Sequence, residues 1–457
     1  MEKTLQKLDM LHGPLWNKLP QFALPVAATA ILEQLFNASD LAVVGHFSGD
    51  ASTIAVAAVG ANSFVISLVV NFFIGIALGA NVVIANAIGR GDDSAVRRAV
   101  HTAVIIAVLG GVLVAAAGEC AAAPLLGALQ VPAEVYPYAL LYLRIYLLGM
   151  PVILLYNFEA AVFRSIGETR IPLQALALSG ILNIILNLFF VIVLKMTVNG
   201  VATATVLSNA VSAALLLRQL LKSDKSIRLD PHALRVDAAS LRKILQIGLP
   251  AGLQSAVFSV SNIVVQSAIN SLGTVVMAAS SAAFNIEVFA YDVFSSFGQA
   301  CTTFVGQNYG AGRLDRCRKT LVLCLVEDAI ASGAAIALVL ASGRFLLSIF
   351  NSDPQVIELG YTRLVMVFSA YTFSLLYDIM SGYLRGFGIS LVPALLTMAG
   401  VCGTRIVWIA AVFPQHRSFQ VIMTAYPISL GLTAVLIFIA LLLYHPSRRS
   451  AKESVHE

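Results

Sequence analysis

Charged side chains are scarce in this 457-residue chain. Asp, Glu, Lys and Arg make up 12% of it, whereas hydrophobic residues make up 58%. A soluble globular domain carries roughly 25% charged residues, so most of this chain does not face water. Apolar stretches of about 20 residues, the length that crosses the hydrocarbon core as a helix, recur along it. The sequence therefore predicts an all-α polytopic membrane protein, and the lack of short alternating segments argues against a transmembrane β-barrel.

Sequence motifs for catalysis and metal binding are also missing. The five cysteines have no paired spacing that would indicate a metal site or a disulfide framework. There is no GxGxxG context, no P-loop sequence and no pair of histidines on one helix face. We therefore expect no catalytic residues, no enzyme activity, no ATP-driven transport, no cofactor and no nucleic-acid partner.

Hydropathy and charge together predict the topology. About twelve spans are expected, at residues 19–45, 53–80, 99–118, 135–160, 171–193, 200–221, 244–270, 275–302, 319–341, 357–384, 391–413 and 419–444. With the N-terminus inside, the outside segments hold only Lys195, Arg344 and Arg417 of the many Lys and Arg residues outside the spans. Because these cations collect on the cytoplasmic side, we expect a multi-pass protein of the inner (plasma) membrane with both termini in the cytoplasm.

The chain repeats itself. The motif AIGRGDDSAVRR (87–98) matches NYGAGRLDRCRK (308–319), and VFRSIGETRIP (162–172) matches YLRGFGISLVP (383–393), both at one offset of 221 residues. This predicts two parallel bundles of six helices with a cleft between them. The expected parts are an interfacial segment 1–18, an N-lobe 19–221, a cytoplasmic linker 222–243, a C-lobe 244–444 and a cytoplasmic tail 445–457.

These motifs carry a family resemblance over nearly all of the chain. GIALGANVVIANAIGRGD (75–92), FVGQNYGAGRLDRCRK (304–319) and RIVWIAAVFP (405–414) resemble the multidrug and toxic compound extrusion (MATE) family. The resemblance implies V-shaped lobes that export amphipathic, often cationic, organic compounds in exchange for H⁺ or Na⁺ by alternating access. The alternatives are a flippase for a lipid-linked or polyisoprenoid substrate and, from a third class, a channel or membrane enzyme.

Asp40 is the most informative residue because it lies within the first span. An ionised carboxylate at membrane depth costs about 2.5–3.5 kcal/mol even on the translocon-insertion scale, which gives the lowest values. Asp40 must therefore be protonated, be paired with another group, or face a water-filled cavity. The resemblance places a coupling acid at this position, with Asn183, Asn187 and Thr205 as its expected partners and H⁺ or Na⁺ as its ion. One branch of the family has a second acid where Asn187 stands, so this chain departs there. A structural hydrogen bond is the alternative role for each of these residues.

A second set of polar residues is expected to contact the substrate in the cavity. It consists of Glu33, Asn157, Gln254, Glu287, Asp292 and Asp378. The alternative for Glu33 is snorkelling to the membrane surface, and for Glu287 and Asp292 it is pairing with Arg144, Arg363 or Arg405. Asp378 corresponds to Asn157 at the 221-residue offset. We expect small organic substrates, contact with the lipid bilayer and a monomer.

Overall fold

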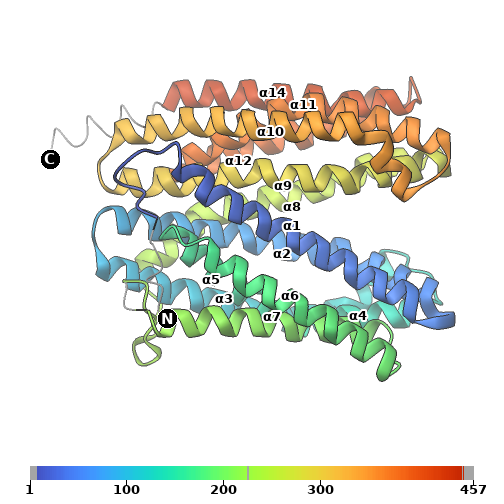
Figure 1. Ribbon diagram of the computed structural model, residues 1–457, viewed down its shortest axis with the longest axis horizontal. Coiled ribbons are helices and arrows are strands. Elements are labelled where there is room, and N and C mark those ends of the chain that lie inside the picture. Colours follow the sequence, from blue (N-terminus) through green and yellow to red (C-terminus); the bar gives the residue numbers. More distant parts are fainter. Residues whose placement is uncertain (1–7, 224–225, 445, 447–457) are drawn as a thin grey trace. The chain divides into compact units, whose positions relative to one another are not determined.

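The computed structural model describes residues 8–223, 226–444 and 446, and every element among them is helical. The chain forms two compact units, and most of their helices are labelled in Figure 1. The helices before the middle connection are α1 (Lys18–Phe47), α2 (Ser52–Gly89), α3 (Asp93–Ala128), α4 (Tyr136–Leu148), α5 (Met150–Ser165), α6 (Arg170–Leu188) and α7 (Val198–Leu221). Those after it are α8 (Ala238–Asn270), α9 (Thr274–Gly310), α10 (Leu314–Phe350), α11 (Pro354–Gly386), α12 (Leu391–Thr397), α13 (Thr404–Ala411) and α14 (Phe419–Tyr444).

The described helices account for the expected spans. Eleven are long and apolar enough to cross a membrane, with α12 and α13 forming one of them, and the pair α4 and α5 makes a twelfth if it is counted as one bent span. This confirms the predicted fold class. Most helices extend beyond the predicted spans, as α2 does to Gly89, because hydropathy detects only the apolar part of a helix.

The bend of 49° between α4 and α5 has a local cause. Pro151 lies in the first turn of α5, where it lacks the N–H that would continue the hydrogen bonding of α4. Gly111 of α3 packs against this point, since a Cβ at Gly111 would lie 2.4 Å from the Cα of Pro151. Two π-helical segments, at Phe189–Val193 and Met398–Gly403, were not expected from the sequence.

Glycines support the internal repeat at the level of backbone conformation. Gly91 and Gly312 both end a helix with φ of +70°, and Gly167 and Gly388 both do so with φ of +84°. The left-handed region favours glycine because a Cβ is disfavoured there. Each pair is separated by the same 221 residues as the sequence motifs, so the two halves repeat in structure as well as in sequence.

The division between the units falls inside two helices. Unit 1 contains Ala28–Gly248, and unit 2 contains Leu8–Ala27 with the described residues from Leu249 on. The first part of α1 therefore belongs to unit 2, and the first part of α8 belongs to unit 1. Pro25 and Pro250 lie within two residues of these divisions. The expected boundaries at residues 19 and 244 mark where apolar sequence begins, whereas the units reflect which residues pack together. Most of the expected tail 445–457 lies outside the described residues.

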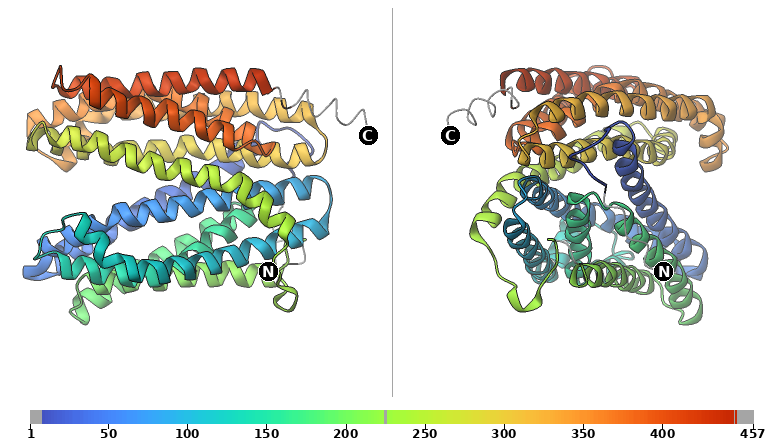
Figure 2. Two further views of the ribbon diagram at one scale, coloured as in Figure 1. Left: turned by 180° about the vertical axis from the view of Figure 1, so that it is seen from behind. Right: turned by 60° about the vertical axis from the view of Figure 1, so that its left-hand side comes forward.

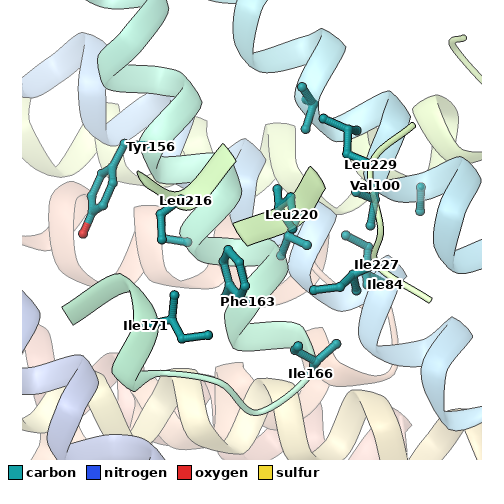
Figure 3. Packing of buried hydrophobic residues seen from close by; sticks show 14 of the residues in the cluster. Ile84, Val100, Tyr156, Phe163, Ile166, Ile171, Leu216, Leu220, Ile227 and Leu229 are labelled. Carbon is teal, nitrogen blue, oxygen red and sulfur yellow. The ribbon is translucent and has the colours of Figure 1, made fainter. Parts of the chain in front are cut away.

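Apolar side chains from several helices form the core at one end of unit 1. Figure 3 shows Tyr156 and Phe163 of α5 packed near Leu216 and Leu220 of α7. The connection between α7 and α8, the long irregular segment in the right-hand view of Figure 2, also contributes to this core.

Candidate functional site

Asp40 lies in α1 and is 5% exposed. Both of its carboxylate oxygens accept a hydrogen bond from a neutral side chain of unit 1. Asn187 of α6 donates to Oδ1 at 2.5 Å, and Thr205 of α7 donates to Oδ2 at 2.8 Å. None of the ion pairs found among the described residues includes Asp40. The carboxylate is therefore held by dipoles and not by a neutralising cation.

The remaining predicted partner, Asn183, completes the group. Asn187 also donates from Nδ2 to Asn183 Oδ1 at 3.1 Å, and Asn183 Nδ2 lies 3.5 Å from Thr205 Oγ1. The two amides are one turn apart on α6 and therefore point from the same helix face. The structure thus brings together Asp40, Asn183, Asn187 and Thr205, the four residues that we expected to share a coupling role.

The hydroxyl of Thr205 can serve two states of this group. Thr205 Oγ1 lies 2.8 Å from Asp40 Oδ2 and 2.9 Å from the backbone oxygen of Val201, but it has one proton to donate. When Asp40 is ionised, Thr205 donates to Asp40. When Asp40 is protonated, its carboxyl group can donate to Thr205, which then donates to Val201. The heavy-atom positions are thus compatible with both the ionised and the protonated form of Asp40.

Several oxygens belong to this hydrogen-bonded group. Besides the two carboxylate oxygens there are Oδ1 of Asn183, Oγ1 of Thr205 and Oδ1 of Asn187. The Asn187 oxygen is buried and has no hydrogen-bond partner in the described part of the chain. Hard cations prefer such oxygen ligands, so the donor set fits a small cation as well as a proton. No group of three His, Cys, Asp or Glu side chains among the described residues is placed to hold a metal ion, and Asp40 is the one acid of this hydrogen-bonded group.

A cavity of about 150 Å³ opens beside Asp40 within unit 1. Asn183 and Thr205 line it, and so do Glu33 and Asn157, two residues that we expected to contact the substrate. Pockets that hold drug-sized ligands usually enclose roughly 300–1,000 Å³. This cavity therefore has room for water or a small cation, and not for a large organic molecule.

A close helix contact positions Asp40. Phe36, one turn before Asp40 on α1, rests its ring on Gly180 of α6, where an added Cβ would lie 1.7 Å from the ring. Gly180 is seven residues before Asn187, hence on nearly the same face of α6. The glycine lets α1 approach α6 closely enough for Asp40 to reach Asn187.

In unit 2, Glu287 forms a buried ion pair. Arg363 of α11 donates to both carboxylate oxygens of Glu287 on α9, at 2.6 and 2.8 Å, and also contacts Ser280. Both partners of the pair are 3% exposed. Of the two roles considered from the sequence, the structure shows the pairing with an arginine. Arg144, another candidate partner, lies 3.3 Å from Glu119 of unit 1 instead.

The other expected residues of unit 2 lie in separate surroundings. Asp292 is half-buried, and its Oδ2 has no partner in the described part of the chain. The carboxylate of Asp378 packs against Gly298, where a Cβ would lie 2.7 Å from Oδ2. Gln254 accepts a hydrogen bond from Arg385 at 2.8 Å. Unlike the residues around Asp40, these are not joined by any hydrogen bond seen among the described residues.

Sequence reasoning missed three buried acids within the predicted spans. Glu159 in unit 1 is fully buried, and Glu327 and Asp328 in unit 2 are 5% and 0% exposed. Both carboxylate oxygens of Glu159 and of Glu327 lack a partner in the described part of the chain, and Asp328 accepts from Ser332 at 2.6 Å. Their position inside apolar spans was the signal that could have identified them.

Comparison with known proteins identifies the family. The family model MatE matches the chain twice, at residues 25–189 and 250–410. The chain belongs to the MatE family. Members of this family are transporters and not enzymes, which confirms the expected absence of catalysis. The double match agrees with the internal repeat.

Individual MatE relatives match over most of their length. The probable multidrug resistance protein NorM of Thermotoga maritima is 29% identical over 85% of this chain and 84% of its own. An FAD transporter of Shewanella oneidensis is 24% identical over 76% and 77%. The outward-facing structure of a multidrug resistance MATE family transporter of the MOP superfamily is 21% identical and superimposes with a TM-score of 0.87, covering 99% of this chain and 100% of that one. The two-lobe fold is therefore shared.

Proposed function

We propose that this protein exports amphipathic organic compounds in exchange for a monovalent cation, H⁺ or Na⁺, that binds at Asp40. The observation that carries the proposal is the buried carboxylate itself. It has no cationic side chain paired with it in the described part of unit 1, it borders a cavity of about 150 Å³, and neutral donors hold both of its oxygens. A charge kept at this cost inside a membrane protein marks an ion pathway or a proton relay by default.

The two states of the site differ in charge. With the cation released, Asn187 and Thr205 stabilise the ionised Asp40. With a proton bound, the carboxyl group is neutral, and with Na⁺ bound, its charge is balanced by the ion. Either form favours an arrangement of unit 1 in which Asp40 is less hydrated. The free energy of the cation gradient thus enters through the charge of one side chain, and alternating access of the cleft would deliver it to the substrate.

The transported compounds are proposed to be small amphipathic molecules, cations above all, and a monomer in the plasma membrane is the expected functional form. The multidrug names of the relatives support an organic substrate, and the FAD transporter among them extends the range to be tested to an anionic cofactor. The cavity beside Asp40 contains two acids and no Lys or Arg. The distribution of Lys and Arg supports cytoplasmic termini.

The test uses purified full-length protein in proteoliposomes loaded with a fluorescent organic cation. Efflux is followed under an imposed H⁺ gradient and, separately, under an imposed Na⁺ gradient. Asp40→Asn removes the charge but fits the site, because the new amide accepts from Asn187 and donates to Thr205, which still donates to Val201. The matched control is Asp315→Asn, the same chemical change at a side chain that is 93% exposed.

We expect one of the two gradients to drive efflux in the wild type and in the control variant, and Asp40→Asn to abolish that dependence. The gradient that works identifies the ion. Gradient-driven efflux that survives in a folded Asp40→Asn protein would overturn the assignment and direct attention to Asp292 and Asp378. If neither gradient drives efflux of cationic or anionic probes, the export function itself is refuted.

A further inference from the structure

The connection between α7 and α8 is a folded part of unit 1. We call residues 226–237 the strap; residues 224 and 225, which precede it, are outside the described residues. Ile227 and Leu229 of the strap are 1% and 3% exposed and belong to the apolar core with Val100 of α3 and Leu220 of α7. Figure 3 shows these side chains grouped together. The Leu229 N–H also bonds to the carbonyl oxygen of Leu220 at 3.2 Å. The strap is thus anchored by its own hydrophobic residues.

Polar contacts with α3 fix the second part of the strap. The Asp230 N–H donates to Nε2 of His101 at 3.3 Å, and Nδ1 of His101 lies 3.1 Å from the carbonyl oxygen of Ala233. Asp237 donates its N–H to Thr102 at 3.0 Å. Two hydrogen bonds lower the pKa of Asp237 below its usual range: the larger effect comes from the Ser240 hydroxyl and the smaller from the Ser240 N–H. This carboxylate is therefore charged at neutral pH. These contacts hold residues 230–237 of the strap against α3.

The exposed side chains of the strap include both basic and apolar residues. Arg228 and Arg235 are exposed, and the neighbours of Arg235 are Leu234 and Val236, which are 42% and 46% exposed. Further exposed cations lie at the adjoining helix ends: Arg218 and Lys222 at the end of α7, and Arg242 and Lys243 at the start of α8.

Two acids are described in this region, Asp230 and Asp237. Asp230 accepts a hydrogen bond from the His232 N–H, and Asp237 accepts one from the Ser240 N–H and lies 3.8 Å from Arg98. Asp237 also lies in the electrostatic field of Arg235. The six exposed cations of the strap and the adjoining helix ends therefore outnumber the two described acids.

We propose that the strap binds the anionic headgroups of the bilayer, with Leu234 and Val236 inserted at the boundary with the acyl chains. The strap joins the ends of two membrane-spanning helices, so the bilayer surface is its immediate neighbour. Basic residues next to spanning helices attract anionic lipid, and apolar side chains among them add hydrophobic contact. Charge complementarity therefore selects anionic lipid as the partner.

Depth in the membrane is the first test. Leu234→Trp is introduced into the full chain with Trp16 and Trp408 replaced by Phe, so that the new indole is the sole source of tryptophan emission. The protein is reconstituted in vesicles that contain brominated phosphatidylcholine, with and without phosphatidylglycerol. We expect the bromolipid to quench the indole, and phosphatidylglycerol to increase the quenching. An indole that stays unquenched in both membranes would show that the strap faces water and would overturn the proposal.

The second test measures lipid binding directly. Wild type and Arg228→Gln/Arg235→Gln are titrated with phosphatidylglycerol in detergent and analysed by native mass spectrometry. Each cation near an anionic surface contributes about fivefold in affinity, so the double variant should bind roughly 25-fold more weakly. The matched control, Lys195→Gln/Arg417→Gln, removes two exposed cations elsewhere and should bind as the wild type does.

The side chains of Arg228 and Arg235 are exposed and are not part of the apolar core, so their replacement should leave the fold intact. Equal loss in both double variants would indicate a general charge effect and contradict a site at the strap. The same proteins are also titrated with a soluble polyanion. If Arg228→Gln/Arg235→Gln binds the polyanion more weakly than the wild type does but binds phosphatidylglycerol equally well, the partner is a soluble acidic molecule and the lipid proposal is overturned. Neither measurement depends on transport, so failure of this proposal and failure of the export proposal are distinguishable.

Discussion

Glu287→Gln should destabilise unit 2 strongly, and the structure explains how strongly. Arg363 donates to both oxygens of Glu287 at 2.6 and 2.8 Å, and both side chains are 3% exposed. Glutamine preserves the shape, but its amide NH₂ faces an arginine N–H and the guanidinium charge stays buried without a counter-ion. Breaking one side of a buried pair costs about 3–5 kcal/mol. For a unit of this size, such a loss corresponds to a drop in melting temperature of roughly 6–20 °C.

Unit 2 contains its own reporters for the measurement. Cys301, Cys317, Cys324 and Cys402 are all free and buried in unit 2. A thiol-reactive fluorogenic dye therefore labels them only as unit 2 unfolds, once the exposed Cys120 has been replaced by Ser. Melting temperatures are compared in the same detergent and at one heating rate, because unfolding of a membrane protein is usually irreversible.

The matched control is a second arginine–glutamate pair in the same unit. Arg344 donates to Glu358 at 2.7 and 3.2 Å with nearly the same geometry, but its side chain is 57% exposed and that of Glu358 is 60% exposed. Glu358→Gln should therefore change the melting temperature little. The double variant Glu287→Leu/Arg363→Met should recover most of the loss, because apolar residues can replace a buried pair without penalty.

The comparison also decides between two roles for Glu287. If the Glu287→Gln and Glu358→Gln proteins have the same melting temperature, the Glu287–Arg363 pair does not stabilise unit 2 and the reasoning is refuted. Glu287 would then be available to attract a cationic substrate, the role considered from the sequence. If stability falls as expected, loss of transport in that variant cannot be taken as evidence of substrate contact.

Three further changes test the site and a helix cap. Thr205→Val should lower gradient-driven efflux by about tenfold, the value of one hydrogen bond to a charge, whereas Thr205→Ser should retain most of it. Gly180→Ala should impair the same efflux, because the added methyl group meets the ring of Phe36, and Phe36→Leu should restore part of it; equal efflux in all three proteins would contradict this positioning role. Hydrogen bonds from the Ala95 N–H and the Ser94 hydroxyl lower the pKa of Asp92, so its contribution to stability is present above its unfolded-state pKa and disappears as pH falls through the lower folded-state value. Melting curves of Asp92→Ala should accordingly converge with those of the wild type in strong acid.

Hydropathy predicted the spans well because a membrane helix must present apolar side chains along its whole crossing. Tertiary detail was less accessible. A proline such as Pro151 permits a kink, but the sequence does not show that Gly111 of α3 packs against the 49° bend. The π-helical segment at Phe189–Val193 leaves no signal in an apolar run, since it differs from an α-helix only in its hydrogen bonding.

The candidate site was predictable in part for a similar reason. Asn183 and Asn187 are one turn apart, so the sequence alone places them on one face. That this face meets Asp40 followed from the family resemblance, because contact between distant helices depends on how each helix is rotated. The same limit applied to Glu287: the sequence offered three possible arginine partners and no means of choosing among them.

The two halves share a backbone pattern but differ in where they keep their acids. The Leu-Pro pairs at 24–25 and 249–250 align Asp40 with Val265, which is 2% exposed in an apolar cluster. The 221-residue offset aligns Asn157 with Asp378. Thus unit 1 has an acid on its first helix and an amide at the second position, whereas unit 2 has an apolar residue and an acid. A valine binds neither H⁺ nor Na⁺, so unit 2 cannot repeat the chemistry proposed for Asp40, and Asp40→Asn and Asp378→Asn test two different sites and not two copies of one.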